Sequence, residues 1–377
     1  MTPRTAGTIH FPADAPDSFA GRLIRWQLEC GRHSLPWQGT RDPYAIWVSE
    51  VMLQQTQVSS VIPYYQRFMA SFPDVASLAG VPVGDVLTLW SGLGYYSRAR
   101  NLHRAACVIM EQYSGVFPQD AATLQRLPGI GRSTAAAIAA FAFGERGTIL
   151  DGNVKRILAR YFGISGYPGE KSVEERLWQL AESLLPAEES NHQIVVSYTQ
   201  ALMDLGALVC ARSRPRCQYC PLQADCIACQ NDLTADLPVP KPRKTLPVRE
   251  TVHLILLDQE RILLKKRPAS GIWGGLWCFP EMSVDQDSID YCEKNLHVRV
   301  TKLARLPHLQ HTFTHFKLII QPHLLQSIMH QPVCEEKCEE NSYLWLTIEQ
   351  AMQQAIPVPV RKLLSMAYPY FQYHIHE

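Results

Sequence analysis

The chain changes its pattern of apolar and polar positions about two thirds of the way along. Between Tyr44 and Met69, apolar side chains recur at helical spacing after a start signal at Asp42 and Pro43. Glycine and proline interrupt this pattern, and no segment before residue 237 alternates with the period of a strand. Further helices are predicted at Val83–Trp90, Ser97–Ser114, Ser133–Phe143, Val154–Phe162, Ser172–Leu185 and His192–Leu205. This part of the chain is therefore predicted to be all-α.

A proline-rich, basic segment that begins at Leu237 ends the helical pattern and favours an extended linker. Beyond it, Thr251–Leu257 and Ile262–Lys266 flank a short polar turn, as the strands of a hairpin do. Other strands are expected in Thr312–Gln321 and Tyr343–Leu346, and helices in Ser288–Asn295 and Ile348–Ala355. We therefore expect a multi-domain chain with an N-terminal tail (1–18), an all-α domain (19–237), a linker (238–249) and an α+β domain (250–377).

The overall composition predicts a soluble globular protein. Hydrophobic residues make up 46% of the chain and charged residues 19%, which is typical of a packed core. The longest apolar run, around Ala135–Phe143, is too short for a membrane span, and residues 1–18 lack the apolar core of a signal peptide. We expect no membrane contact.

Charge is balanced over the whole chain but not along it. The 377 residues include 36 Lys and Arg against 35 Asp and Glu, so the net charge of +1 gives no general attraction to a polyanion. Residues 91–160, however, carry nine basic and four acidic side chains, and residues 238–270 carry eight and three. Residues 161–200 carry two and six. The basic stretches are where the phosphates of a nucleic acid would be bound.

Four of the eleven cysteines fall inside one 17-residue window, at Cys210, Cys217, Cys220 and Cys226, with Cys229 just beyond. Four thiolates on so short a loop can hold either zinc or an iron–sulfur cluster. Among these four, only Cys217 and Cys220 form a Cys-x2-Cys pair, whereas zinc sites usually show two, and this favours a single [4Fe-4S] cluster. The remaining cysteines are scattered, including Cys334 and Cys338, to which we assign no function. A reducing compartment, the cytoplasm, is therefore expected.

A glycine-containing string, Leu127–Gly131, precedes the helix predicted from Ser133. Two glycines beside a helix N-terminus, Gly129 and Gly131, leave backbone N–H groups free to meet a phosphate. A plain turn between two helices is the alternative interpretation.

Two acidic residues are candidates for catalysis. Asp151 starts the helix predicted from Val154, where capping is its ordinary role. Glu50 lies among apolar neighbours, which should raise the pKa of its carboxyl group, although a Glu on the solvent face of a helix is the commoner case. One protonated and one ionised carboxyl group would suit cleavage of a bond to an anomeric carbon.

Together, these strings resemble the helix-hairpin-helix DNA glycosylases that carry a [4Fe-4S] cluster, and specifically the MutY-type adenine DNA glycosylases. The matching strings are Leu35–Trp37, Trp47–Val58, Gly92–Arg98, Leu127–Gly131, Asp151–Val154 and the four-cysteine loop. The resemblance implies a monomeric enzyme, associated with the nucleoid, that binds duplex DNA containing adenine opposite 8-oxoguanine or guanine.

The resemblance also implies roles for single residues. Protonated Glu50 would donate to N7 of a flipped-out adenine, and ionised Asp151 would stabilise or trap the oxocarbenium-like sugar. Asn153 would orient that carboxylate or the attacking water. Gln200 would help to recognise the adenine, and Gln55, Leu93 and Tyr95 would fill or wedge the space around the lesion pair. Other residues expected to contact DNA are Trp37, Gly129, Gly131, Ser133 and Lys155.

The C-terminal region resembles the Nudix-like domain of these enzymes, which reads the 8-oxoguanine. Phe313, Thr314 and His315 match the Phe-Ser-His turn of that domain, with threonine in place of serine. The Nudix catalytic box, with its paired glutamates, is missing from Met282–Val298, so pyrophosphohydrolase activity is not expected.

Two alternatives remain. Endonuclease III-like glycosylase/lyases carry a nucleophilic lysine where this chain has Ser133, and without an amine no Schiff base with the sugar is expected. A non-catalytic DNA-damage binder would be marked by loss of Glu50 or Asp151, and both are present. The sequence therefore favours a monofunctional DNA N-glycosylase.

Overall fold

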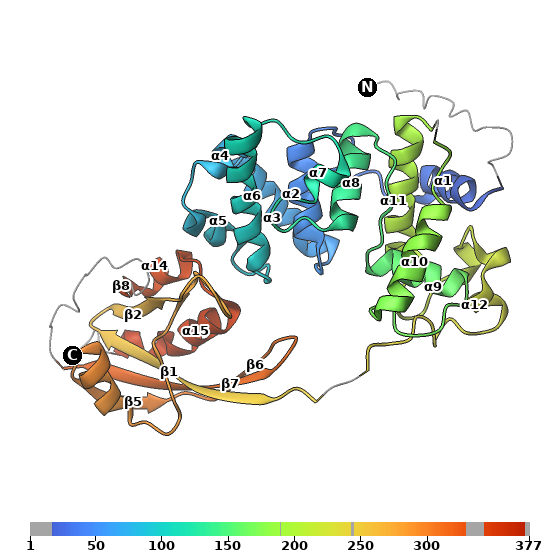
Figure 1. Ribbon diagram of the computed structural model, residues 1–377. Coiled ribbons are helices and arrows are strands. Elements are labelled where there is room, and N and C mark those ends of the chain that lie inside the picture. The colour runs from blue at the N-terminus through green and yellow to red at the C-terminus, as the bar shows by residue number, and fades with distance from the viewer. Residues whose placement is uncertain (1–16, 189, 243–244, 329–342, 374–377) are drawn as a thin grey trace. The chain divides into compact units, whose positions relative to one another are not determined.

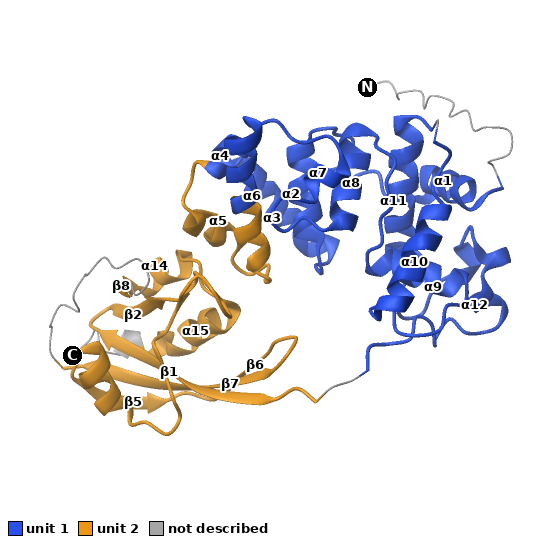
Figure 2. Cartoon of the chain, viewed as in Figure 1, with its two compact units in different colours: residues 1–79, 104–243 blue, residues 80–103, 244–377 orange. Residues whose placement is uncertain are grey.

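The computed structural model describes residues 17–188, 190–242, 245–328 and 343–373 (Figure 1). Cys334 and Cys338 lie outside these residues, as does most of the N-terminal tail. The chain forms two compact units: unit 1 comprises residues 1–79 and 104–243, and unit 2 comprises residues 80–103 and 244–377 (Figure 2).

Residues 80–103 are expected from the sequence in the helical domain (19–237), and by their contacts these residues group differently. They group instead with the C-terminal residues. Within unit 2, the Arg100 guanidinium donates to the Gly274 carbonyl oxygen at 2.7 Å, and the Ser91 hydroxyl donates to the Ile356 carbonyl oxygen at 2.9 Å. Such contacts between residues far apart in the chain leave no local pattern in the sequence.

Unit 1 is all-α over its described residues, which confirms the predicted class. Its helices are α1 (Phe19–Cys30), α2 (Pro43–Leu53), α3 (Val58–Ser71), α4 (Val75–Ala79), most of α6 (Ser97–Tyr113), α7 (Ala121–Leu124), α8 (Arg132–Phe143), α9 (Gly152–Tyr161), α10 (Lys171–Ser183), α11 (His192–Leu208) and α12 (Ile227–Gln230). Two 3-10 turns, η1 (Cys217–Tyr219) and η2 (Gln223–Asp225), lie between α11 and α12. No described helix has the length and apolar character that a membrane span requires.

The single helical stretch expected between Tyr44 and Met69 is wrong, because the chain turns between α2 and α3. The Asp42 carboxylate caps α2 by accepting from the backbone N–H groups of Tyr44 and Ala45. After α2, Gln55 adopts a left-handed backbone conformation with φ of 56°, which ends the helix. The polar residues at this turn are left at the surface of unit 1.

The glycine-containing string forms the turn between α7 and α8. Gly129 has φ of 80°, a conformation that favours glycine, and Gly131 is the N-cap of α8 with no side chain capping the helix. The alanines of α8 from Ala135 to Ala140 are buried. Their small side chains let α8 pack against α2 and α11.

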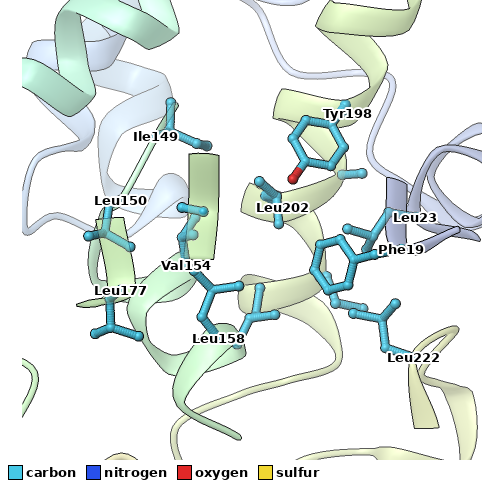
Figure 3. Packing of buried hydrophobic residues seen from close by; sticks show 14 of the residues in the cluster. Phe19, Leu23, Ile149, Leu150, Val154, Leu158, Leu177, Tyr198, Leu202 and Leu222 are labelled. Atoms are coloured by element: carbon cyan, nitrogen blue, oxygen red, sulfur yellow. The ribbon is translucent and has the colours of Figure 1, made fainter. Parts of the chain in front are cut away.

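The start of α9 is held by a buried cluster of apolar side chains. Val154 and Leu158 of α9 pack with Tyr198 and Leu202 of α11, and Leu23 of α1 belongs to the same cluster (Figure 3). Burying a side chain of this size contributes about 1.5–3 kcal/mol. The cluster therefore fixes the position of α9 and, with it, of the residue that caps the helix.

Unit 2 combines α5 (Val83–Trp90) with a mixed sheet and further helices, which confirms the predicted α+β class. The sheet order is β3-β2-β1-β7-β5, with β1 parallel to β7 and antiparallel to β2. The strands are β1 (Val248–Asp258), β2 (Arg261–Lys266), β3 (Trp277–Cys278), β4 (Glu281–Met282), β5 (Val300–Arg305), β6 (Leu309–Thr312), β7 (Lys317–Ser327) and β8 (Tyr343–Thr347). The helices are α13 (Ser288–Tyr291), a π-helical turn (Cys292–Leu296), α14 (Ile348–Gln353) and α15 (Val358–Tyr373).

The strand expected in Thr312–Gln321 begins only at Lys317 and continues to Ser327 as β7. Residues 313–316 form a turn between β6 and β7, closed by the backbone N–H of Phe313, which donates to the Phe316 carbonyl oxygen at 2.9 Å. Phe316 is buried and Thr314 is exposed. The turn therefore presents the Phe313–His315 string at the end of a hairpin.

Candidate active site

Glu50 and Asp151 line the same cavity in unit 1, which has a volume of about 1230 Å³. Glu50 comes from the last turn of α2, and Asp151 is the N-cap of α9. Gln55, Ser133, Asn153 and Lys155 also line this cavity. The structure thus brings together residues from three separate segments of the sequence.

Glu50 also lines a second cavity, which has a volume of about 450 Å³. Trp37 and Gln200, both expected to contact DNA or the base, lie in its wall. Glu50 borders both cavities, so its carboxyl group can reach a ligand in either one.

The surroundings of the two carboxyl groups favour a proton on Glu50. Burial raises the pKa of Glu50 to about 8, and the negative charge of Asp151 acts in the same direction. Burial also raises the pKa of Asp151, but backbone N–H donors and the cations Arg156 and Lys155 oppose this rise. Glu50 has no comparable donors among the described residues. A single proton shared by the pair therefore belongs on Glu50.

Asp151 is held by its role as a helix cap. Its Oδ1 accepts from the backbone N–H of Asn153 at 3.0 Å and from that of Val154 at 2.8 Å. Its Oδ2 has no hydrogen-bond partner among the described residues. Capping thus orients the carboxylate and leaves one oxygen for a ligand in the cavity.

Arg156 joins this helix start to the cysteine loop, a connection that the sequence analysis missed. Its guanidinium donates to the Asn153 side-chain oxygen at 2.8 Å, to the Gly206 carbonyl oxygen at 2.7 Å and to the Cys210 carbonyl oxygen at 2.7 Å. A Cβ atom on Gly206 would lie 2.5 Å from the Cβ of Asn153. Glycine at position 206 therefore allows α11 to approach the start of α9.

A buried charge network positions Gln200 at the smaller cavity and was also missed. The Gln200 side-chain nitrogen donates to Asp204 Oδ1 at 2.9 Å. Asp204 is fully buried and accepts from the backbone N–H of Arg32 at 2.8 Å and from Arg32 Nε at 2.6 Å. Arg32 lines both cavities.

The cysteine loop follows α11 and wraps around the end of α9. The thiol of Cys220 is near enough to those of Cys210, Cys217 and Cys226 to interact with their charges. The buried guanidinium of Arg160 donates to the Cys210 sulfur at 3.3 Å, to the Leu237 carbonyl oxygen at 2.8 Å and to the Ala211 carbonyl oxygen at 2.7 Å. A buried cation beside a cysteine sulfur suits an anionic thiolate ligand.

Two further observations bear on the ligand set. Cys226 and Cys229 form a second Cys-x2-Cys pair. The sequence-based argument against zinc counted only the pairs among the four cysteines from Cys210 to Cys226, and so did not include this one. Among the described Cys, His, Asp and Glu side chains, no group of three or more is arranged to hold one metal ion.

Unit 2 holds five of the predicted residues: Leu93, Tyr95, Phe313, Thr314 and His315. Tyr95 is 47% exposed and has a left-handed backbone with φ of 49°, whereas Leu93 is 8% exposed. The Phe313 ring stacks on Phe316 at 4.6 Å, and the Thr314 hydroxyl lies 3.4 Å from Nδ1 of His315. Tyr95 is therefore an accessible aromatic side chain, and Leu93 is mainly a packing residue in this structure.

Comparisons with known proteins agree with these features. Residues 48–183 match the HhH-GPD superfamily of base excision DNA repair proteins, and residues 251–366 match the NUDIX domain. An adenine DNA glycosylase of Buchnera aphidicola (subspecies Acyrthosiphon pisum, strain APS) is 37% identical, covering 92% of this chain and 97% of the relative. The human adenine DNA glycosylase is 34% identical, covering 93% of this chain and 74% of the relative. The solved structure of a thermostable thymine-DNA glycosylase is 29% identical with a TM-score of 0.50, covering 56% of this chain and 95% of that one.

This chain belongs to the adenine DNA glycosylases. It is accordingly a DNA N-glycosylase of base excision repair, and DNA is its substrate.

In this adenine DNA glycosylase, the structure groups only part of the predicted site. Glu50, Asp151 and their neighbours surround the two cavities of unit 1, and Gly129 and Gly131 form the α7–α8 turn outside both cavity walls. Lys155 is paired with Glu174, its Nζ lying 2.6 Å from the carboxylate.

The buried Asp204 network gives a stability prediction for the glycosylase. Asp204→Asn should lower the free energy of unfolding by about 3 kcal/mol, because it leaves the Arg32 charge without its buried partner. Asp225→Asn is a matched control: Asp225 pairs with Arg22 at 2.6 Å, but its side chain is 57% exposed. The control should lose no more than about 1 kcal/mol in urea-induced unfolding. Equal losses in the two variants would contradict a structural role for Asp204.

Proposed function

We propose that this enzyme hydrolyses the N-glycosidic bond of adenine opposite 8-oxoguanine or guanine and leaves the DNA strand intact. The main supporting observation is the position of Glu50, which borders both cavities and lies beside Asp151. A proton donor between a base-sized cavity and a larger, open one suits a bond that joins a base to the DNA backbone.

The smaller cavity is the proposed adenine site. Adenine in a duplex is stacked, so the nucleotide must be flipped out before its glycosidic bond can be reached. Because the Gln200 amide nitrogen donates to Asp204, its Oε1 is left to accept a hydrogen bond from the exocyclic amine of adenine. A base with a carbonyl oxygen at that position offers no donor to Gln200, which favours adenine.

Bond cleavage in this proposal divides the work between the two carboxyl groups. Glu50, protonated at neutral pH, donates to N7 of adenine and makes the base a better leaving group. As the sugar gains oxocarbenium character, the negative charge of Asp151 stabilises it through the unpaired Oδ2. Water then adds at the anomeric carbon. Asn153 supports this step through its backbone N–H, which fixes Asp151 Oδ1.

For the cysteine loop we propose a [4Fe-4S] cluster ligated by Cys210, Cys217, Cys220 and Cys226. Its support is the set of four interacting thiols and the hydrogen bond from buried Arg160 to Cys210. When bound, the cluster would cross-link the loop. Arg156 donates hydrogen bonds to both the loop backbone and Asn153, so a cross-linked loop would also hold the start of α9 in place.

For recognition of the opposite base we propose the turn at Phe313–His315 together with Tyr95. Thr314 supplies an exposed hydroxyl group at the end of the β6–β7 hairpin. Tyr95, exposed and held in a left-handed conformation, suits stacking against a base.

The substrate preference can be tested by single-turnover kinetics on duplexes containing adenine opposite 8-oxoguanine, guanine or thymine. We expect adenine release to be fastest opposite 8-oxoguanine and slowest opposite thymine. Equal rates on all three duplexes would discard the proposed preference while leaving glycosylase activity itself intact.

Strand cleavage can be tested by borohydride trapping on the 8-oxoguanine duplex. Ser133, at the start of α8, has a hydroxyl group that accepts from the Leu150 backbone N–H at 3.0 Å, and it offers no amine to the sugar. We expect base release without an efficient covalent adduct. A strong adduct would restore the bifunctional alternative.

A further inference from the structure

Trp273 is a buried aromatic side chain that contacts the turn proposed to read the opposite base. It is 7% exposed and lies between β2 and β3. The centroid of its ring lies 5.3 Å from that of Phe313 and 5.6 Å from that of His311, and the Arg267 guanidinium lies 5.9 Å from the same ring. Phe313 and His311 come from the β6–β7 hairpin. A tertiary contact therefore joins Trp273 to the turn.

The loop that carries Trp273 is itself held in place. Trp273 has a left-handed backbone conformation with φ of 54°, which a bulky residue keeps only where the surrounding structure imposes it. Its carbonyl oxygen accepts from the Leu276 backbone N–H at 3.0 Å, and the Gly274 carbonyl oxygen accepts from the Arg100 guanidinium at 2.7 Å. A Cβ atom on Gly274 would clash with the Ala269 carbonyl oxygen. The Trp273 ring therefore projects from a tightly packed backbone.

The turn between β6 and β7 rests on aromatic rings and presents polar groups beyond them. Phe313 stacks on the buried ring of Phe316 at 4.6 Å, while Thr314 and His315 are exposed. The Trp273 ring supports Phe313 from a different part of unit 2. The position of Phe313, and of the Thr314 hydroxyl group next to it, therefore depends on a ring outside the hairpin.

We propose that Trp273 is a positioning residue for recognition of 8-oxoguanine: its ring holds Phe313, and through it the Thr314 hydroxyl group, in place before DNA binds. The inference rests on the role proposed above for the Phe313–His315 turn. A turn that is already ordered loses less conformational entropy when it meets its ligand. Trp273 acts through the turn and is assigned no contact with the base.

Positioning of the turn can be separated from the chemistry of base release. Glu50 and Asp151 line the cavities of unit 1, whereas Trp273 and the turn belong to unit 2. Removing the Trp273 ring should therefore slow adenine release opposite 8-oxoguanine and leave the rate opposite guanine unchanged. A general loss of stability would instead lower both rates in proportion.

The test measures single-turnover adenine release by the full chain, below saturating enzyme, from duplexes with adenine opposite 8-oxoguanine and opposite guanine. Trp273→Leu should lower the ratio of the two rates by about 2–10-fold, the range that one aromatic pair contributes. Trp273→Phe keeps a ring and should retain most of the ratio. Trp277→Leu makes the same change in β3, at a ring that lies 5.9 Å from the Lys266 ammonium group, and should retain the ratio fully.

Thr314→Ala separates the positioning role from recognition by the turn. It removes the hydroxyl group that Trp273 is proposed to hold, so it should lower the ratio, and adding Trp273→Leu should then lower the ratio little further. If Thr314→Ala keeps the full ratio, recognition by Thr314 is wrong and the positioning role is overturned with it. If Thr314→Ala lowers the ratio and Trp273→Leu does not, only the positioning role is overturned.

Amide hydrogen exchange of the DNA-free protein reports on the turn directly. In Trp273→Leu, exchange should accelerate in peptides that cover residues 309–317, while peptides from β8 and α14 should exchange as in the unmodified protein. Faster exchange throughout unit 2, or a proportional fall of both rates, would overturn the positioning role. If Trp273→Leu does not fold, Phe313→Leu removes the other ring of the contact from a partly exposed position. That variant should lower the ratio, and an unchanged ratio would overturn the proposal.

Discussion

Changing Glu50 to glutamine is expected to abolish adenine release while leaving duplex binding largely intact. Glutamine keeps the size and the position of the side chain between the two cavities but cannot supply the proton that N7 of adenine requires. Loss of a general acid should lower the single-turnover rate by about 10²–10⁴-fold. Binding of the duplex, measured separately, should change little because phosphate contacts are untouched.

The pH dependence of the same reaction checks the assignment. Because the pKa of Glu50 is raised to about 8, the carboxyl group carries its proton below that pH and loses it above. The rate of the unmodified enzyme should therefore fall as pH rises through about 8, and the residual rate of Glu50→Gln should not follow this profile. Glu175→Gln, at an exposed position on α10, is the control and should keep the full rate. Appreciable adenine release by Glu50→Gln would contradict the assignment of Glu50 as the proton donor.

Changing Asp151 to asparagine should lower the rate by about 10²–10³-fold, because it removes the charge that stabilises the oxocarbenium-like sugar. Asparagine is as good an N-cap as aspartate, so α9 should keep its start and the melting temperature should change little. Rate and melting temperature are measured on the same preparation. Asp120→Asn, at the exposed N-cap of α7, is a matched control in which neither quantity should change much. A variant that melts early would instead assign Asp151 a purely structural role.

The sequence could predict the parts of the molecule that depend on local strings. The class of each domain followed from the period of apolar residues, and α5 begins and ends at the predicted residues Val83 and Trp90. Glu50, Asp151 and the cysteines could be selected because each lies in an unusual local setting: an apolar helix, a helix start, or a dense cysteine loop.

What the sequence could not predict depends on contacts between distant residues. Arg32 and Asp204 are 172 positions apart, and only the fold reveals that the Arg32 guanidinium pairs with the buried Asp204 carboxylate. In the sequence, Gly206 is only a residue that destabilises a helix. The fold shows that it lacks a side chain where α9 packs against α11. The break after α2 was missed because it depends on the left-handed backbone conformation of Gln55. Glutamine is not a residue type that signals such a turn in the sequence.

The discontinuous make-up of unit 2 limits how this protein can be taken apart or recombined. A cut in the linker leaves residues 80–103 on the N-terminal fragment, away from Gly274 and Ile356, to which Arg100 and Ser91 donate. Residues 244–377 alone would then present those two carbonyl oxygens without their donors. A chimera that grafts the C-terminal region onto another helical domain therefore keeps these two hydrogen bonds only if it also carries the 80–103 segment.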